Sequence, residues 1–259
     1  ILHAATAFGK TVVCSAMIAE RKVNTLIILE SSALMEQWED ALHRFLDINE
    51  ELPEYRTKTG RIKKRKSLIG KLQAQHDSMT GIIDIAMAGS LCKKGEFHAF
   101  LNDYGMIIVD ECHHAASDTI ADILKEIKAR YVYGVTATPN RGDGLEKINY
   151  MLLGPIRYRY TSKEKAKAQG IEHLVYPRFT HTVPPRGVQI SGMHPNEAYE
   201  IIRNNDIRDE QIIEDVRECV SSGRTPVVLS KYKDHSEKLY ERLKSYADHV
   251  FLMTGNNSK

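Results

Sequence analysis

Several features are scarce in this sequence of 259 residues, and each scarcity excludes a class of protein. There are only four cysteines and no C-x-x-C pair, so we expect reduced, cytosolic thiols rather than a disulfide framework or a zinc ribbon. No apolar run is long enough to cross a membrane, and we expect no signal peptide. The formal net charge is only +2, so total charge does not indicate a polyanionic partner.

The composition that remains is that of a soluble globular protein. Hydrophobic residues make up 42% and charged residues 27%, and the length suits one large or two modest domains. The first residues resemble the tail of a strand, and the last follow closely on another. We therefore expect both ends to be cuts within a longer polypeptide.

Short apolar runs alternate with amphipathic segments through the first 160 residues. The runs predict buried strands at 25–29, 82–87, 106–109 and 131–136, and the helical spacing predicts helices at 11–21, 33–45 and around 120–127. Trp38 and Phe45 share the apolar face of the second helix, so we expect both in the core. The alternation predicts an α/β fold with a parallel sheet covered on both faces.

Prolines interrupt the pattern after Gly154, which indicates a connector at 161–195 with strands near 174–176 and 178–183. A long helix is expected at 196–221, closed by Gly223. It is followed by a strand at 227–229, a helix at 234–246 and a strand at 250–252. The domain limits expected are therefore 1–160, 161–195 and 196–259, the last being an unfinished α/β domain.

Residues 4–11 match A-x-x-x-x-G-K-T, the phosphate-loop pattern with alanine in the first glycine position. Such a loop surrounds phosphates with backbone N–H groups at a helix N-terminus. Lys10 is expected to reach the β- and γ-phosphates and the Thr11 hydroxyl to bind Mg²⁺. The other nucleotide contacts expected in this loop are Ala5, Thr6, Ala7, Phe8 and Gly9. The alternative is an ordinary strand–turn–helix with an exposed lysine.

Asp110 and Glu111 follow directly on an apolar strand. A carboxylate at the carboxyl edge of a parallel sheet can hold Mg²⁺ beside a phosphate loop, and one aspartate suffices because Mg²⁺ keeps several waters. Glu111 can then orient or deprotonate the attacking water. The alternative is a strand that ends in two solvated acids.

Cys112, His113 and His114 come next, but three adjacent residues do not easily converge on one metal ion. We expect the histidines to hydrogen-bond across the nucleotide cleft or to the loop that contains Thr136 and Thr138. That loop also closes a strand, and its hydroxyls can sense the γ-phosphate. Taken alone, it could be a plain turn that ends in proline.

The three segments together resemble the superfamily 2 helicases of the DExH type, over essentially the whole chain. Lys10-Thr11 correspond to motif I, residues 110–113 to motif II and residues 136–138 to motif III. Residues 31–38 and 88–91 lie where this family contacts DNA, and residues 227–232 resemble motif IV. The resemblance implies two RecA-like domains around an ATP cleft, the second truncated, with ATP and Mg²⁺ as cofactors.

Residues 134–145, followed by Gly154-Pro155, resemble more specifically a bacterial branch related to the xeroderma pigmentosum group B type and to the Res subunits of restriction enzymes. Helicases of this branch often belong to bacterial defence or mobile-element conflict systems. The chain departs from the family where Ala7 replaces a common glycine and where Ser31-Ser32 replace a proline-threonine-arginine. The adenine-recognition segment and motifs V and VI, with the arginine finger, would lie outside it.

Basic residues gather between the first and second motifs, with only Glu54 nearby to oppose them. Such a run is often a solvated surface, but on a motor domain it can contact a phosphate backbone. The run consists of Arg56, Lys58, Arg61, Lys63, Lys64, Arg65, Lys66 and Lys71.

The sequence thus predicts an ATP-dependent DNA helicase or translocase, with RNA as a possible track and a nuclease or further domains as partners. On its own this chain is expected to be a weak ATPase. One rival is a motor that remodels complexes or feeds a nuclease without separating strands. The other is a non-catalytic nucleic-acid clamp.

Overall fold

A computed structural model describes residues 1–57, 59–93, 96–139, 144, 146–180, 182–183, 187 and 191–255. The chain divides into two compact units, Ile1–His173 and Leu174–Lys259. No helix in the described part is long and apolar enough to cross a membrane. The two units are considered separately below.

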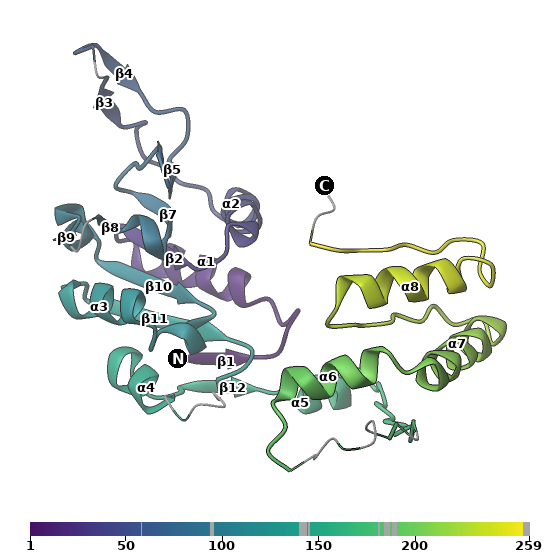
Figure 1. Cartoon of the computed structure of the whole chain (residues 1–259). Helices are drawn as coiled ribbons and strands as arrows, with labels where there is room; N and C mark the ends of the chain where they lie inside the picture. Colours follow the sequence, from purple (N-terminus) through teal and green to yellow (C-terminus); the bar gives the residue numbers. More distant parts are fainter. Residues whose placement is uncertain are drawn as a thin grey trace. The chain divides into compact units, whose positions relative to one another are not determined.

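An eight-stranded sheet forms the centre of the first unit, in the order β12-β1-β11-β10-β2-β7-β5-β6 (Figure 1). All neighbours are parallel except β5 and β6, which pair antiparallel at one edge. The strands are β1 (Leu2–Ala4), β2 (Thr25–Leu29), β5 (Ile69–Gln73), β6 (His76–Asp77), β7 (Ile83–Met87), β10 (Met106–Asp110), β11 (Tyr131–Thr136) and β12 (Tyr158–Tyr160).

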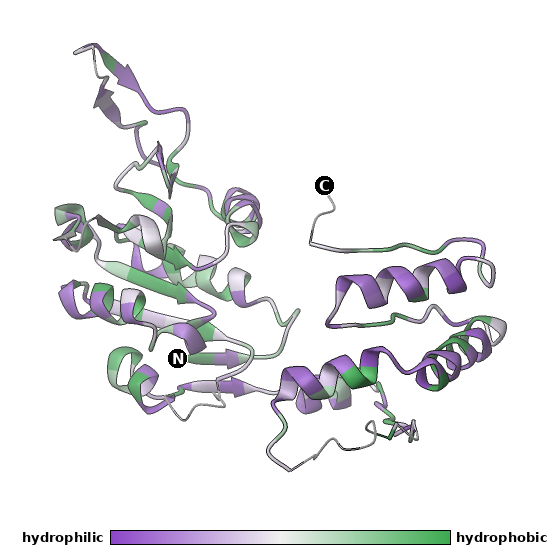
Figure 2. Ribbon diagram, in the orientation of Figure 1, coloured by the Kyte–Doolittle hydropathy of each residue, from purple (hydrophilic) through white to green (hydrophobic). Residues whose placement is uncertain are grey.

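Every residue of β2 and β10 is buried, so these central strands are covered on both faces of the sheet. Side chains alternate along a strand, so Leu26 and Ile28 enter one core while Ile27 and Leu29 enter the other. Figure 2 shows the resulting apolar centre between more polar helices. This near-continuous hydrophobicity is typical of parallel strands covered on both faces.

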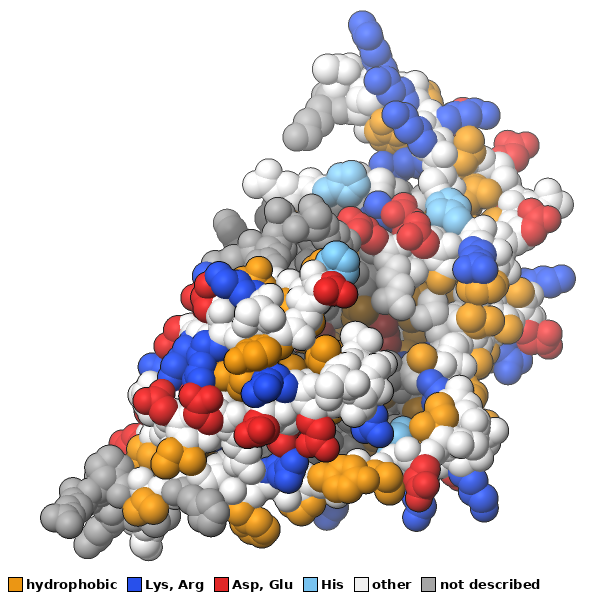
Figure 3. Space-filling model, turned by 90° about the vertical axis from the view of Figure 1, so that its right-hand side faces the viewer, with side chains coloured by type: hydrophobic (Ala, Val, Ile, Leu, Met, Phe, Trp, Pro, Cys, Tyr) orange, Lys and Arg blue, Asp and Glu red, His pale blue; other side chains and the backbone are white. Residues whose placement is uncertain are grey.

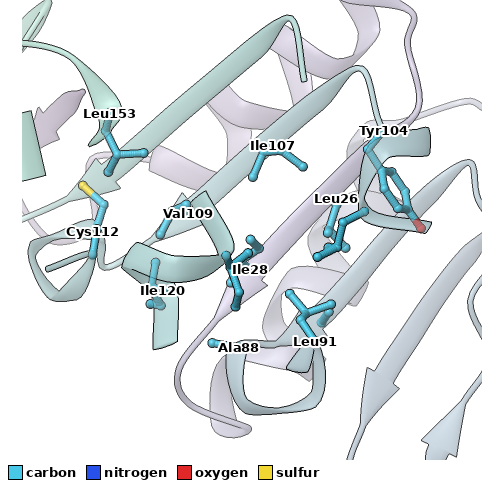
Figure 4. Close-up of a cluster of buried hydrophobic side chains, with 14 of the residues drawn as sticks. Leu26, Ile28, Ala88, Leu91, Tyr104, Ile107, Val109, Cys112, Ile120 and Leu153 are labelled. Atoms are coloured by element: carbon cyan, nitrogen blue, oxygen red, sulfur yellow. The ribbon is translucent and has the colours of Figure 1, made fainter. Parts of the chain in front are cut away.

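Helices α1 (Lys10–Arg21) and α2 (Ala33–Phe45) cover one face of the sheet, with Cys14, Ile18, Trp38 and Leu42 in the core. The opposite face carries α3 (Asp118–Glu126), α4 (Glu146–Leu153) and three short 3₁₀ segments, and Figure 4 shows the core beneath them. Those segments are η1 (Ala88–Ser90), η2 (Ala99–Asp103) and η3 (Cys112–His114). Helix α5 (Ser162–Ala168) follows β12.

Two small antiparallel pairs lie outside the main sheet. β3 (Glu54–Arg56) and β4 (Ile62–Lys64) form a hairpin that stands clear of the body in Figure 1. β8 (Cys92–Lys93) pairs with β9 (Glu96–Phe97).

Three helices make up the described regular structure of the second unit: α6 (Pro195–Arg203), α7 (Asp206–Ser221) and α8 (Lys233–Leu243). A buried carboxylate joins two of them, because Asp209 of α7 accepts from His235 at 2.9 Å and pairs with Lys238 at 2.8 Å. Burial alone would raise the pKa of Asp209, but the bonds from Lys238 and His235 outweigh it and lower the pKa. Ile213, Leu239 and Leu243 form the apolar contact.

The expected α/β class and parallel sheet are confirmed, and the predicted strands at 25–29 and 131–136 match β2 and β11. The expected helix at 196–221 is instead two helices, broken where Asn204 leaves helical geometry and Asn205 caps α7. The strands expected at 174–176, 227–229 and 250–252, and in the described part of 178–183, are not formed. Most of their apolar residues are exposed, Leu229 by 89% and Phe251 by 83%, while Val250 and Leu252 are half-buried, and no neighbouring strand among the described residues pairs with them.

Trp38 is in the core as expected, at 1% exposure, but the same expectation for Phe45 is wrong. Phe45 is the last residue of α2 and is 45% exposed. The Arg44 guanidinium lies 5.5 Å from the centre of its ring, so a cation covers one ring face in place of core atoms.

Gly134 in β11 offers a test of the packing between the sheet and η3. A Cβ at this position would lie 2.8 Å from Cys112 Sγ and 2.8 Å from a Leu153 methyl carbon. Gly134→Ala should therefore lower the free energy of unfolding by about 1–3 kcal/mol, as overpacked core substitutions do. Chemical denaturation measures this, and Gly89→Ala is the control because nothing lies within 4 Å of its added carbon. Equal stability of the two variants would contradict the close packing.

Candidate nucleotide-binding site

The phosphate-loop segment connects β1 to α1 at the carboxyl edge of the sheet. Ala7 has φ 57° and Gly9 has φ 96°, and these two left-handed residues turn the chain into the helix. In the described part of the chain, the amides of Gly9, Lys10 and Thr11 donate no hydrogen bond. A helix N-terminus with free N–H groups is suited to an anion. Lys10 Nζ lies 3.5 Å from Ala4 O, within the same loop.

Residues from β12 and α5 hold this loop, a contact that the sequence reasoning missed. The Phe8 ring centre is 5.0 Å from that of Tyr160 and 5.9 Å from that of Tyr158. Lys165 Nζ donates to Thr6 O at 2.8 Å, and the amide of Ala5 donates to Tyr160 O at 2.9 Å. The signal for this contact in the sequence is the pair Tyr158 and Tyr160, because alternate residues of a strand share a face. The backbone of the loop is therefore fixed from outside as well as by its own turn.

Asp110 ends β10 at 8% exposure, two strands away from β1. Trp38 Nε1 donates to its Oδ2 at 2.7 Å, and the amide of Glu111 donates to its Oδ1 at 2.9 Å. Burial raises the pKa of Asp110 above its usual value, while these two bonds and the charge of Lys10 act in the opposite direction. The tryptophan was predicted only as core, yet it also orients the candidate metal ligand.

Glu111, His113 and Thr136 form one cluster at the ends of β10 and β11. His113 Nδ1 lies 2.9 Å from Thr136 Oγ1 and 3.3 Å from Glu111 Oε2, and Thr136 Oγ1 donates to Glu111 Oε2 at 3.3 Å. The predicted contact between the histidine and the threonine loop is thus confirmed. Glu111 itself has φ 45°, a strained conformation for a residue with a side chain, and such strain is typical of functional sites.

The cluster is extended on both sides. The amide of the exposed Thr138 donates to Thr136 Oγ1 at 3.1 Å, which ties the following loop to the strand end. On the other side the buried Asn149 of α4 donates to His113 O at 3.0 Å. The sequence did not indicate this role for Asn149, because a single asparagine in a helix is most often on the solvent-exposed side.

The residues present fit a magnesium ion. Thr11 Oγ1 makes no hydrogen bond within the described residues, and Asp110 supplies a carboxylate whose oxygens keep further lone pairs. Hard oxygen donors, few in number, are what Mg²⁺ uses when it keeps its waters. Among the described residues no three His, Cys, Asp or Glu side chains converge on one point.

The two buried cysteines near the site are not nucleophiles at neutral pH. Burial raises the pKa of the Cys14 thiol and of the Cys112 thiol to about 12 in each case. Both thiols are therefore protonated, and a nucleophilic cysteine acts as its thiolate. Their role is packing, and the Gly134 contact of Cys112 shows how tight that packing is.

The two first-unit segments that the resemblance assigns to DNA contact begin at the same edge of the sheet. His114 Nδ1 is 3.8 Å from Glu30 Oε2 and Ser117 Oγ donates to Glu30 Oε1 at 3.3 Å, so η3 contacts the segment after β2. Residues 31–38 and 88–91 follow β2 and β7 respectively. Residues 140–143 and 145, which belong to the segment 134–145 that resembles the bacterial branch, lie outside the described residues, as does Lys58 of the basic run.

Comparison with known proteins places these features in a family. Residues 1–141 match the family model for the res subunit of type III restriction enzymes. The chain is 29% identical over 161 residues to the DNA 3'-5' translocase XPB2 of Sulfurisphaera tokodaii, covering 62% of this chain and 32% of that protein. The chain spans less than half the length of the curated relatives that it matches first.

Two solved structures match this chain at low identity. The Hef helicase domain of Pyrococcus furiosus is 16% identical, with a TM-score of 0.47 over 94% of this chain and 49% of that chain. T4 UvsW is also 16% identical, with a TM-score of 0.45 over 98% of this chain and 48% of that chain.

The hydrogen bond from Trp38 to Asp110 gives a testable pH dependence. Trp38→Phe keeps an aromatic ring but removes a donor to the charged carboxylate, so the pKa of Asp110 should rise further. A hydrogen bond to a charged group contributes about 1.5–3 kcal/mol, which corresponds to about 1–2 pH units. The acid limb of Mg-dependent nucleotide binding should move to higher pH by that amount.

Calorimetric titrations of MgATP across the pH range measure this shift. Leu42→Val is the control, because it also thins the core beneath α2 but does not touch Asp110. An acid limb that stays in place in Trp38→Phe, or that moves equally in Leu42→Val, would contradict the role of the indole N–H.

Proposed function

The chain belongs to the family of the res subunit of type III restriction enzymes, and on that premise we propose that it is part of a superfamily 2 helicase or translocase that couples hydrolysis of Mg-ATP to movement on nucleic acid. The observation that carries the proposal is the Glu111–His113–Thr136 cluster. It joins the ends of two strands beside the phosphate loop, where a hydrolytic base and a coupling element are both needed.

Nucleotide binding is assigned to residues 5–11. The free amides of the helix N-terminus surround the phosphates, and Lys10 turns from Ala4 O to the β- and γ-phosphates. Thr11 and Asp110 would hold Mg²⁺. When bound, Mg²⁺ neutralises charge on the phosphate oxygens. Asp110 is already oriented for this by two donors, so its carboxylate loses little freedom on binding.

Water activation is assigned to Glu111. Its carboxylate is about one-third exposed, so it can reach a water in front of the γ-phosphate. His113 and Thr136 contact the same carboxylate oxygen and fix its direction. A positioned carboxylate acts as general base or orients the water for in-line attack.

Coupling follows from the same contacts. When the γ-phosphate leaves, Glu111 and His113 lose the group that they face, and Thr136 responds because it bonds both. Thr136 also holds the amide of Thr138, so the loop after β11 moves with it. Small shifts of this kind change loop positions in nucleotide switches.

The wider setting belongs to the proposal as well. We place the track as DNA, with RNA possible, and the setting as a cytoplasmic bacterial restriction or defence system with a nuclease or further domains as partners. Family membership supports this setting, and the free state of all four cysteines agrees with a reducing compartment. The domain limits 1–160, 161–195 and 196–259 stay a prediction.

Two alternatives differ in what the motor achieves. A translocase that feeds a nuclease or remodels complexes would displace a third strand from a triplex without unwinding a duplex, so the two assays separate it from a helicase. A non-catalytic clamp would bind nucleic acid without turnover. The intact set of Lys10, Thr11, Asp110 and Glu111 argues against the clamp.

Lys10→Ala tests the nucleotide site directly. Loss of the ammonium removes a charge-assisted contact of about 1.5–3 kcal/mol, so MgATP affinity should fall about 10- to 150-fold. Calorimetric titration measures it, with Lys22→Gln just beyond the other end of α1 as the control. Unchanged affinity in Lys10→Ala would remove the phosphate-loop assignment.

Glu111→Gln tests the assignment of the base. The amide keeps the shape of the side chain and leaves Asp110 in place, so ATP should still bind while turnover falls about 10²–10⁴-fold. Single-turnover hydrolysis in the full-length protein measures this, and Glu20→Gln, on the exposed surface of α1, is the matched control. Turnover within a few-fold of wild type would show that another residue activates the water.

A further inference from the structure

Positive charge is concentrated in one short segment of the chain. Residues 54–66 contain seven basic residues and one acidic residue, a net charge of +6. Because the whole chain has a net charge of +2, all other residues together have −4. A polyanion that approaches this chain is therefore attracted by the hairpin and repelled, on average, by the rest. Lys and Arg side chains cover the projecting end in Figure 3.

The segment is a regular ribbon and not a loose loop. Five successive residue pairs face each other, from Pro53 with Arg65 to Thr57 with Arg61. At the two ends, the amide of Arg65 donates to Pro53 O and the amide of Thr57 donates to Arg61 O, each at 2.8 Å. Four steps of about 3.4 Å make the ribbon about 14 Å long. The Thr57 hydroxyl also bonds both the amide and the carbonyl of Arg61 and closes the turn.

The base of the hairpin is fixed to the body of the first unit. The Arg65 guanidinium lies 4.4 Å from the centre of the Tyr55 ring and donates to Asp77 O at 3.3 Å. Lys71 of the basic run bonds Glu39 of α2 at 2.7 Å, so its charge is already paired. Arg65 and Lys71 are therefore positioning residues for the ribbon. Among the described residues of the run, the cations left to bind a partner are Arg56, Arg61, Lys63, Lys64 and Lys66.

The free cations lie on both faces of the ribbon. Residues opposite each other in an antiparallel pair share a face, and neighbours along a strand alternate. Arg56 and Lys64 therefore lie on one face, while Arg61 and Lys63 lie on the other. All four side chains are exposed, and none forms an ion pair within the described part of the chain.

We propose that the β3–β4 hairpin enters the major groove of duplex DNA and contacts the phosphates of both groove walls, an inference that rests on the proposed function and names its track. A two-stranded ribbon fits this groove, which is about 12 Å wide and 8.5 Å deep. Cations on both faces match a partner with phosphates on both sides. A single row of phosphates would need cations on one face only.

Other nucleic acids fit the ribbon less well. The major groove of an RNA duplex is deep and narrow, so it does not admit the ribbon. Single strands are held by exposed aromatic rings on which bases stack. The only aromatic residue of the hairpin is Tyr55, and the Arg65 guanidinium already lies on its ring. The exposed apolar residue near the turn is Ile62, which suits contact with base edges.

The hairpin acts on binding and not on the chemistry. The sheet order places four strands between β1, which leads into the phosphate loop, and β5, which follows the hairpin. Five spacings of about 4.8 Å separate these two strands by about 24 Å. The groove contact can therefore be measured without nucleotide.

Two double variants of the full chain test the proposal. Arg56→Gln with Lys64→Gln removes the charges of one face, and Arg61→Gln with Lys63→Gln removes those of the other. The probe is a 20-bp DNA duplex titrated without nucleotide at several salt concentrations. If each variant loses two phosphate contacts, the slope of log affinity against log salt falls by about 1.8. Between 50 and 200 mM salt, the affinity of the wild type should then fall about 12-fold more than that of either variant.

Lys128→Gln with Lys147→Gln is the matched control, since it removes two exposed charges, after α3 and in α4, that form no ion pair within the described part of the chain, and it should leave the slope unchanged. Circular dichroism checks that each variant is folded. If only one of the two hairpin double variants weakens duplex binding, the ribbon lies along a single row of phosphates, and the groove contact is overturned. Equal losses for a single strand or an RNA duplex, or no duplex binding by the wild type, would also overturn it.

The proposed function fails in a different way. If neither hairpin double changes duplex binding while Lys10→Ala loses nucleotide, only the groove contact is wrong. If Lys10→Ala keeps its nucleotide affinity, the motor assignment is wrong, whatever the hairpin variants do.

Discussion

The parallel pairing of β1, β11 and β10 is the constraint on which the candidate site depends. The register sets His3 opposite Thr136 and Asp110 opposite Val135, so the ends of all three strands meet at one edge. Parallel strands need long crossover connections, which is why the three segments are far apart in the sequence. Gly134 allows η3 to pack closely on β11, and His113 of η3 lies 2.9 Å from Thr136 at the end of that strand.

The same edge carries an energetic conflict at Asp110. Burial raises the pKa of its carboxyl, so the folded state binds the proton more tightly than the unfolded state does. The contribution of Asp110 to stability therefore declines as the pH rises above the unfolded pKa of about 3.9. The donors Trp38 and the Glu111 amide reduce that loss without removing it. A site that holds a carboxylate ready for a cation is less stable while the cation is absent.

The sequence was sufficient for the parallel sheet and for the placement of Asp110, Glu111 and Thr136 at strand ends, because buried strands and their polar ends leave strong local patterns. It was not sufficient for Trp38 or Asn149, whose partners lie 72 and 36 residues away. Such contacts depend on helix orientation, which no local pattern contains. The strands expected in the second unit failed for a related reason. An apolar run becomes a strand only when a neighbour completes its hydrogen bonds, and Leu229 has none to bury it.

Helix α2 connects the two functional regions of the first unit. Glu39 bonds Lys71 of β5, the strand that follows the hairpin, and the preceding residue, Trp38, bonds Asp110 at the nucleotide edge. An α-helix is stiff over its length, so a displacement of α2 changes both contacts together. The two contacts come from adjacent residues of one helix, so the packing of α2 sets the positions of β5 and of the Asp110 carboxylate at the same time. All of these residues lie within Ile1–His173, so this shared positioning is a property of the first unit alone.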